Sequence, residues 1–298
     1  MSFRPDSPVQ LPNGGLVCKA HHLKVCGICT VDYSFMDDIL GSADEPMRDG
    51  GDDDDDDRRY PNAFVSSVFA APEALASANT GPVIPVKYKP PRDGDSPQTL
   101  FPARRSTKAI PPVIRFIHAS DPKQFLIFTD GACLNNGQAN PKAGCSFVYR
   151  PSTEEPRIVG HAEFRLENKG PTGEVHQQTS NRAELRAVIA ALRYRSWSGE
   201  GFTTLIIATD SEYVVEGATS WVRGWLRRGW KTSMGAAVKN RDLWEALLGE
   251  FKEHAAWGMD VKFWRIPREW NTEADRYAGL AAARDEKEEF QDLMGVLV

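Results

Sequence analysis

The sequence has 298 residues, 41% of them hydrophobic and 26% charged, which is an ordinary composition for a folded soluble protein. The formal net charge of −5 conceals a balance near neutrality, because one run of six aspartates at 52–57 more than accounts for it. No stretch of about 18 apolar residues marks a membrane span, and the five cysteines do not form a secreted disulfide framework. We expect a soluble, intracellular, monomeric protein without a membrane partner, located in the nucleus or cytoplasm, with the mitochondrion left open.

Residues 1–123 show no sustained helical or strand periodicity and contain proline-rich stretches such as "KYKPPRDGDSP". This composition predicts a largely disordered or loosely ordered N-terminal region, in which the aspartate run at 52–57 is a solvated segment. We therefore place the folded catalytic domain at 124–285 and a short C-terminal tail at 286–298.

The N-terminal region contains one cluster of metal-ligating residue types. The stretch "CKAHHLKVCGIC" at 18–29 places Cys18, His21 or its neighbour His22, Cys26 and Cys29 at Cys-x2-His and Cys-x2-Cys spacings. Such spacings can surround a tetrahedral Zn²⁺. Only four residues separate the two halves, which is tighter than in most zinc fingers. Incidental reduced cysteines therefore remain the alternative interpretation.

From residue 124 onward, apolar strand-like runs alternate with helical patterns. Three strands with short connections predict an antiparallel meander, and the strand–helix–strand order that follows predicts parallel pairing. We therefore expect an α/β fold with a mixed five-stranded sheet, three antiparallel strands and then two parallel ones, with helices on both faces. The expected strands are 125–130, 144–150, 157–166, 203–210 and 260–267, and the expected helical segments are 180–197, 211–228, 240–255 and 271–290.

Four carboxylates occupy unusual places in these elements. Asp130 and Asp210 each follow an apolar run and a threonine, so neighbouring parallel strands would bring them to the same edge of the sheet. Glu184 falls in the first turns of a helix that we expect Ser180 to cap, and Asp275 lies on a small-residue face. Each has a simpler interpretation, namely a turn with Gly131 for Asp130 and a helix-dipole interaction for Glu184.

Convergence of all four acids favours a metal site over these separate interpretations. Hard oxygen ligands of this kind suit two Mg²⁺ ions about 3.5–4 Å apart, with Mn²⁺ as an alternative metal. Such a pair of ions promotes phosphodiester hydrolysis, because one ion activates water and the other stabilises the leaving oxygen.

Six motifs in roughly 124–284 resemble the type 1 ribonuclease H family: "TDGACLNNG", "SNRAELRAVIAAL", "ATDSEYVVEG", "WVRGWLRRGWKT", "VKNRDLW" and "NTEADRYA". The resemblance implies a ribonuclease H-like fold and endonucleolytic cutting of the RNA strand in an RNA–DNA hybrid, leaving 5′-phosphate and 3′-hydroxyl ends. It also implies that the catalytic, metal-binding acids are Asp130, Glu184, Asp210 and Asp275, with Gly131 included in the metal site.

A segment rich in tryptophan and basic residues, 221–241, contains no acid between its ends. Alternating cations and aromatics are typical of a nucleic-acid surface, although Trp221 and Trp225 are also spaced as a helix core face. By resemblance the segment is the basic protrusion that grips the DNA strand, and Asn240 with Thr179 or Arg182 forms a phosphate pocket. The expected protrusion contacts are Trp221, Trp225, Arg227, Arg228, Trp230, Lys231 and Lys239.

Discrimination of RNA from DNA requires short polar groups facing the 2′-hydroxyls in the minor groove. By resemblance to the family, the residues at these positions are Cys133, Asn136, Ser180, Asn181 and Glu212. Ser180 stands where asparagine is commoner in the family, and Glu212 stands where glutamine is commoner. Either change would reshape hydrogen bonding to the hybrid.

One departure concerns turnover. Many relatives carry a glycine–histidine loop before the last acid, whereas "FWRIPREWNTEAD" is shorter and contains no histidine. Arg268 or Glu269 is our candidate substitute. Two alternatives to the hybrid nuclease stay open: a hybrid-binding module with weak or no catalysis, and a DNA-directed nuclease or integrase of the same fold.

Overall fold

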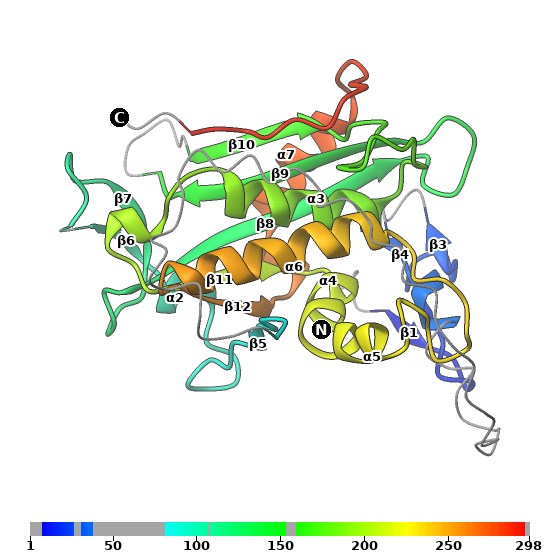
Figure 1. Ribbon diagram of the computed structural model, residues 1–298, viewed down its shortest axis with the longest axis horizontal. Coiled ribbons are helices and arrows are strands. Elements are labelled where there is room, and N and C mark those ends of the chain that lie inside the picture. The colour runs from blue at the N-terminus through cyan, green and yellow to red at the C-terminus, as the bar shows by residue number, and fades with distance from the viewer. Residues whose placement is uncertain (1–7, 27–30, 38–80, 107, 153–158, 296–298) are drawn as a thin grey trace.

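The computed structural model describes residues 8–26, 31–37, 81–106, 108–152 and 159–295. Its centre is an eight-stranded mixed sheet in which β10, β9, β8, β11, β12 and β5 are neighbours in that order, while β7 pairs with both β6 and β8 (Figure 1). Two separate hairpins, β1–β2 and β3–β4, come from the N-terminal residues. The strands are β1 (Val9–Gln10), β2 (Leu16–Val17), β3 (Val25–Cys26), β4 (Val31–Asp32), β5 (Val86–Lys87), β6 (Ala103–Arg105), β7 (Ile114–Ile117), β8 (Gln124–Leu134), β9 (Lys142–Arg150), β10 (Gly160–Arg165), β11 (Thr204–Thr209) and β12 (Asp260–Arg265).

The predicted mixed sheet and its α/β character are confirmed. Strands β8, β9 and β10 pair antiparallel, and β11 lies parallel to both β8 and β12. Every residue of β11 is buried, as its continuous apolar sequence indicates for a central parallel strand.

The count of five strands is wrong for the whole sheet, because β5, β6 and β7 extend it. These strands come from 81–123, so the expectation of a loosely ordered region fails for that segment. Each of the three has two to four residues, too few to show a strand period. Tertiary contacts fix them instead, since Arg115 of β7 is buried and forms an ion pair with Glu200 at 2.8 Å. The domain boundary predicted at residue 124 stays a prediction, and the aspartate run 52–57 lies outside the described residues.

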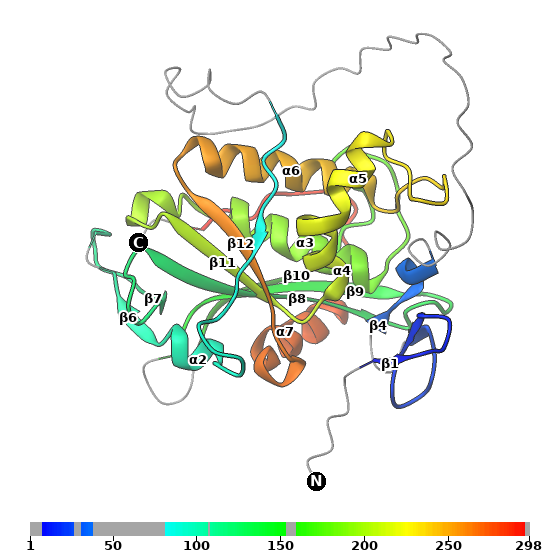
Figure 2. The same cartoon turned by 90° about the horizontal axis from the view of Figure 1, so that it is seen from below.

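Helices cover both faces of the sheet, as predicted. Figure 2 shows α3, α4, α5 and α6 on one side and α2 and α7 on the other. The helical segments are η1 (Ser34–Met36), α2 (Pro97–Leu100), α3 (Ser180–Arg193), η3 (Ser198–Glu200), α4 (Glu212–Glu216), the π-helical turn η4 (Gly217–Trp221), α5 (Val222–Arg227), α6 (Arg241–Ala256), η5 (Arg268–Trp270) and α7 (Thr272–Ala282). None of the helices in the described part of the chain has the length and apolar composition needed to cross a bilayer.

The last helix ends earlier than predicted, at Ala282 rather than near residue 290. The residues directly beyond it, "ARDEKEEF", are mostly charged and lack the apolar face of an amphipathic helix. The tail packs Phe290 and Leu293 against the main core, and backbone hydrogen bonds also hold it, from Asn168 N to the Lys287 carbonyl at 2.7 Å and from Gly295 N to the Tyr194 carbonyl at 2.7 Å. The described part of the C-terminal tail is therefore attached to the domain.

Candidate active site

Two of the four acids meet because their strands are neighbours. Strand β11 runs parallel to β8 with Ala208 beside Phe128, so two residues further along each chain Asp210 comes beside Asp130. The position of Asp130 differs from the expectation in one respect, because β8 continues to Leu134 in its pairing with β9. Asp130 thus lies inside a strand, just beyond the point where β11 stops pairing, and its side chain is only 6% exposed.

Gly131 brings the third acid to the same place. A Cβ atom at this position would lie 2.1 Å from the backbone nitrogen of Glu184 and 2.4 Å from the carbonyl carbon of Ala183. Only glycine therefore lets the first turn of α3 approach β8 so closely. Direct participation of Gly131 in metal binding stays a prediction, whereas this contact already gives it a positional role.

The helix cap of α3 is not the residue that we predicted. Thr179 is the N-cap, and its hydroxyl accepts a hydrogen bond from Arg182 N at 3.2 Å, while Ser180 is the first helical residue. Glu184 then follows in the first turns of the helix, as expected. Its carboxylate accepts a hydrogen bond from the Ser211 hydroxyl.

Asp275 reaches the site from the opposite face of the sheet. Helix α7 lies against β9, where a Cβ at Gly144 would be 2.2 Å from Ala282 N and 2.4 Å from the Ala278 carbonyl oxygen. The hydroxyl of Ser146 also donates to the Ala274 carbonyl at 2.6 Å. The Ser146 hydrogen bond holds the first turn of α7, and with it Asp275, while the contact at Gly144 fixes the later part of the helix against β9.

The electrostatics of the four acids reflect their proximity. Burial and the charges of Asp210, Asp275 and Glu184 hold the pKa of Asp130 well above its usual value, with Arg268 opposing them in part. Burial likewise raises the pKa of Glu184 to about 8; the Ser211 hydrogen bond opposes the shift and the charge of Asp210 adds to it. Clustered carboxylates that resist ionisation in this way suit a divalent cation, which would neutralise them and accept their oxygens as ligands.

Three polar residues that sequence reasoning missed, or placed only loosely, hold these acids in position. The buried side-chain amide of Asn271 donates to Asp210 Oδ1 at 2.8 Å and to the Thr129 carbonyl at 3.0 Å. Ser211 caps α4 while it donates to Glu184. Arg268 forms an ion pair with Asp275. The available signals were slight: a serine and an asparagine immediately before helices, where capping is the ordinary interpretation.

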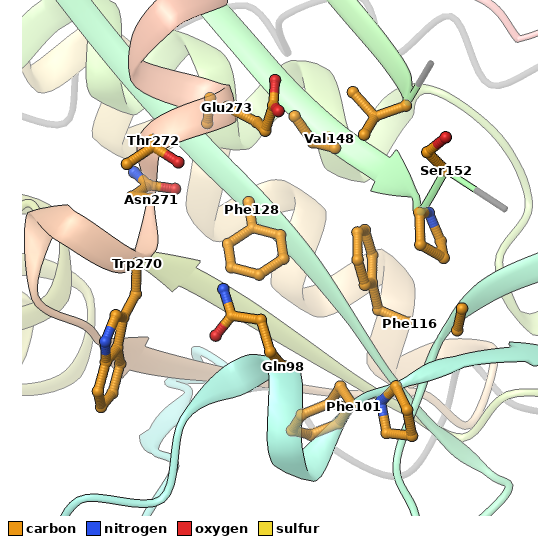
Figure 3. A pocket seen from close by; sticks show the side chains of 15 residues that line it. Gln98, Phe101, Phe116, Phe128, Val148, Ser152, Trp270, Asn271, Thr272 and Glu273 are labelled. Atoms are coloured by element: carbon orange, nitrogen blue, oxygen red, sulfur yellow. The ribbon is translucent and has the colours of Figure 1, made fainter. Parts of the chain in front are cut away.

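A cavity of about 520 Å³ with both apolar and polar lining borders this site (Figure 3). Phe101, Phe116 and Phe128 line it together with Glu273 and with Asn271, which contacts Asp210. None of the four acids lines this cavity, so it adjoins the candidate active site without containing its chemistry.

Four of the five residues predicted to face the minor groove, Cys133, Asn136, Ser180 and Asn181, lie around the start of α3, whereas Glu212 begins α4. Asn136 donates to the Ser180 hydroxyl at 3.0 Å, and the Asn181 amide donates to the Asp32 carbonyl at 3.4 Å. Glu212 forms an ion pair with Arg265 at 2.9 Å. Cys133, Asn136, Ser180 and Asn181 are all at most 8% exposed, a degree of burial that their predicted role in substrate contact did not indicate.

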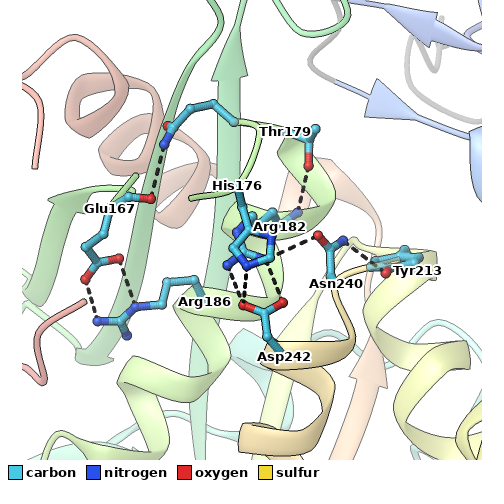
Figure 4. Close-up of polar contacts among 9 residues, drawn as sticks. Glu167, His176, Thr179, Arg182, Arg186, Tyr213, Asn240 and Asp242 are labelled. Carbon is cyan, nitrogen blue, oxygen red and sulfur yellow. Dashed lines mark hydrogen bonds and ion pairs between the residues drawn. The ribbon is translucent and has the colours of Figure 1, made fainter. Parts of the chain in front are cut away.

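In the predicted phosphate pocket, Arg182 is paired with an acidic residue that the sequence did not reveal (Figure 4). Thr179, Arg182 and Asn240 do lie together, but both terminal nitrogens of Arg182 are bound by the Asp242 carboxylate, at 2.9 and 2.6 Å. His176 Nε2 lies 3.3 Å from the same carboxylate. The charge of Arg182 is therefore largely balanced within the protein, and phosphate contact by these residues stays a prediction.

In the basic protrusion, cations and tryptophans separate by exposure. Trp225 and Trp230 are 8% and 9% exposed and belong to the main core, which agrees with the core-face interpretation for Trp225 on α5. Trp221 is half-buried and packs against Phe35 and Trp225, with ring centroids 5.3 and 6.0 Å apart. The cationic side chains point outward over this aromatic support; the exposed ones are Arg223, Arg227, Arg228, Lys231, Lys239 and Arg241.

Fold and site together define a nuclease-type α/β domain with a carboxylate-lined site at the edge of a mixed sheet. The family model for RNase H matches residues 122–283. Human ribonuclease H1 is 31% identical over 208 residues, which cover 67% of this chain and 66% of the human protein, just under two thirds of its length. Ribonuclease HI of Xylella fastidiosa (strain 9a5c) is 39% identical over 132 residues, 44% of this chain and 75% of that protein.

The chain therefore belongs to the RNase H family, and the prediction of a type 1 ribonuclease H is confirmed. Among solved structures, LC9-RNase H1, a type 1 RNase H with the type 2 active-site motif, is 26% identical. The alignment covers 54% of this chain and 72% of that one, with a TM-score of 0.37, which is too low to add to the assignment.

Proposed function

We propose that this protein is an endoribonuclease that hydrolyses the RNA strand of RNA–DNA hybrids and leaves 5′-phosphate and 3′-hydroxyl ends. Three observations support the proposal: the strand register that brings Asp210 beside Asp130, the close approach of Glu184 to Gly131, and the charge interactions of Asp130 with Glu184, Asp210 and Asp275. The foamy-virus protease–reverse transcriptase solved with an RNA/DNA hybrid is a fold neighbour, but its similarity to this chain is low and adds no weight.

The four acids would hold Mg²⁺, or Mn²⁺ with the same oxygen ligands. Bound divalent ions supply Lewis-acid catalysis at the scissile phosphate, in the manner of two-metal nucleases. The protein's own contribution is orientation. Asn271 fixes one carboxylate oxygen of Asp210, and Ser211 fixes one of Glu184, so both acids are oriented before substrate arrives.

Arg268 supplies a fixed positive charge in place of a loop histidine. Burial by itself lowers the pKa of this guanidinium, but the charges of Asp275, Asp130 and Asp210 outweigh burial and raise the pKa above its usual value. A group that stays protonated at every physiological pH cannot shuttle a proton. We therefore assign Arg268 to electrostatic positioning of Asp275 and to compensation of the acid cluster.

Recognition of the hybrid is assigned to two surfaces. We assign contact with the 2′-hydroxyls of the RNA strand, which distinguish RNA from DNA, to the polar side chains at the start of α3 and to Asn136, which is hydrogen-bonded to Ser180. The exposed cations of the protrusion, among them Arg227, Arg228 and Lys231, would bind backbone phosphates without regard to sequence.

A cleavage assay with a labelled hybrid, single-stranded RNA, duplex RNA and duplex DNA, each with and without Mg²⁺, tests the proposal. We expect Mg²⁺-dependent cutting of the hybrid alone. Asp210→Asn should abolish cutting and retain hybrid binding, whereas the exposed Asp285→Asn makes the same chemical change away from the site and should leave both unchanged. Binding without cleavage by the wild-type chain would favour the binding-module alternative, and cleavage of duplex DNA would favour a nuclease of another kind.

A further inference from the structure

Three metal-ligating side chains of the N-terminal segment converge at one point. The ligand atoms of Cys18, His21 and Cys26 all lie within 4.8 Å of one another, and Cys26 Sγ is 3.5 Å from His21 Nδ1. A tetrahedral zinc site with Zn–S of about 2.3 Å and Zn–N of about 2.05 Å places sulfur and nitrogen ligands about 3.6 Å apart. The observed separation is therefore the one that a shared Zn²⁺ would produce.

The local backbone is shaped to bring these residues together. His22 N donates to the Cys18 carbonyl at 2.8 Å, and Cys18 N donates to the Leu23 carbonyl at 2.9 Å, so the chain turns back at His22, where φ is +52°. Both cysteines are buried while His21 is exposed. Among the strand residues of the hairpins β1–β2 and β3–β4 only Leu16, Val17 and Cys26 are buried, and segments of this size usually need a metal or a disulfide for stability.

The segment that carries this cluster lies over the surface assigned to the hybrid. Val25 packs so closely against Gly137 that a Cβ atom added to Gly137 would lie 2.8 Å from the Val25 side chain. The Asp32 carbonyl accepts the Asn181 amide at 3.4 Å, and Lys239 Nζ lies 3.5 Å from Ser34 Oγ. Contacts therefore extend from the predicted minor-groove residues to the protrusion, and Figure 1 shows β3 and β4 at that end of the domain.

Aromatic packing anchors the same segment. Phe35 is buried in the main core, with its ring centroid 5.3 Å from that of Trp221 and 5.7 Å from that of Tyr213. Trp221 is thus covered by the protein's own chain on the side that Phe35 contacts. Asp32 also brings a negative charge toward Glu184, which is unfavourable for an approaching phosphate backbone.

We propose that Cys18, His21 and Cys26 bind one Zn²⁺, and that this ion holds residues 16–26 and 31–37 as a cap over the hybrid-binding surface. The capping role rests on the proposed function, whereas the metal site does not. Opening of the cap would expose Asn181 and Trp221 to substrate. Cys29, the remaining residue of the predicted set, lies outside the described residues, and the proposal does not depend on it.

Metal content of the full-length chain tests the site. We expect about one zinc per chain in the wild type and in His22→Asn, a control that keeps the neighbouring left-handed turn, and much less than one in Cys18→Ser and Cys26→Ser. When Co²⁺ replaces zinc, the wild type should show the visible thiolate-to-metal absorption of a tetrahedral site. Cys18→Ser and Cys26→Ser should not show it. The metal site would be overturned if the wild-type protein contained no zinc and showed no such absorption with Co²⁺. The Cys26 thiol would then only be hydrogen-bonded to His21.

Hybrid affinity tests the cap, measured by fluorescence anisotropy without Mg²⁺ so that cleavage does not interfere. If the cap is closed in nine molecules of ten, opening it lowers the dissociation constant about tenfold. We expect this gain on zinc removal by a chelator and in Cys26→Ser, and also in Phe35→Ala, which keeps the zinc ligands but loses the anchor. Unchanged or weaker binding after zinc loss would overturn the cap. If no form binds the hybrid, the proposed function and the cap both fail, while the zinc content still decides the metal site.

Discussion

The buried ion pair between Arg182 and Asp242 joins two helix starts that the site needs. Arg182 lies in the first turn of α3, two residues before Glu184, and Asp242 lies in the first turn of α6, beside Asn240. The two side chains are 2% and 7% exposed. Asp242→Asn keeps the shape of the side chain but leaves the buried guanidinium without its counter-charge.

We expect Asp242→Asn to lower the free energy of unfolding by about 3 kcal/mol. Removing one partner of a buried pair costs about 3–5 kcal/mol, and the lower end applies here because Asn240 Oδ1 remains 3.5 Å from Arg182. For a domain of this size the change corresponds to a loss of about 6–12 °C in Tm. Urea and thermal unfolding at pH 7 provide the measurement.

A double variant separates charge from packing. Arg182→Met with Asp242→Leu removes both charges and should recover most of the loss, since replacing a buried pair by apolar groups is often neutral. The reasoning is refuted if Asp242→Asn costs less than about 1 kcal/mol, or if the double variant is as unstable as the single one.

The pH dependence of this difference has a definite sign. Burial by itself would raise the pKa of Asp242, but the hydrogen bonds and charge of Arg182 and the charge of His176 outweigh it, so the pKa lies below the ordinary 3.8. A depressed pKa in the folded state stabilises the protein above the unfolded-state value, and that contribution is lost as pH falls through the folded-state value. The stability gap between wild type and Asp242→Asn should therefore shrink as the pH falls below about 4.

Three further substitutions test the site itself. Gly131→Ala should destabilise the domain by about 1–3 kcal/mol and reduce hybrid cleavage about 100-fold, because the added Cβ would clash with the backbone of Glu184. Gly249→Ala is the matched control, because the space around Gly249 is open. If both variants behaved alike, the close approach of α3 to Gly131 would be contradicted. Asn271→Ala should lower kcat with little change in KM and cost about 1.5–3 kcal/mol of stability, and a normal kcat would show that Asp210 does not need this hydrogen bond. Arg268→Ala should slow turnover more than it weakens hybrid binding, an idea that unchanged single-turnover and multiple-turnover rates would dispose of.

The parts of the fold that the sequence predicts are those with a long local signal. Strand β11 has six consecutive buried residues, and α3 has 14 residues with a clear apolar face, so periodicity alone places both. Strand β5 has two residues and β6 has three, all of them exposed, so neither strand shows such a pattern. Their place is decided by pairing with β12 and β7, which is a property of the folded chain rather than of the segment.

The same distinction separates the predicted site residues from the missed ones. Asp130 and Asp210 were found because a carboxylate after an apolar run conflicts with its surroundings, and such a conflict is visible in the sequence. Asp242 gave no such signal, since an acid in the first turn of a helix is favourable by itself. Its partner Arg182 lies 60 positions away along the chain, and only the packing of α3 against α6 reveals the pair.

Asp130, Glu184 and Asp275 lie in three different elements and Asp210 directly follows a fourth, so the geometry of the site depends on how closely these elements pack. Close backbone contacts at Gly131 and Gly144 bring α3 and α7 against opposite faces of the same pair of strands, β8 and β9. A change of a few tenths of an ångström at either contact would displace Glu184 or Asp275 while the cores on both faces remain filled. Metal binding and catalysis should therefore be more sensitive to substitutions at these two glycines than the global stability of the fold.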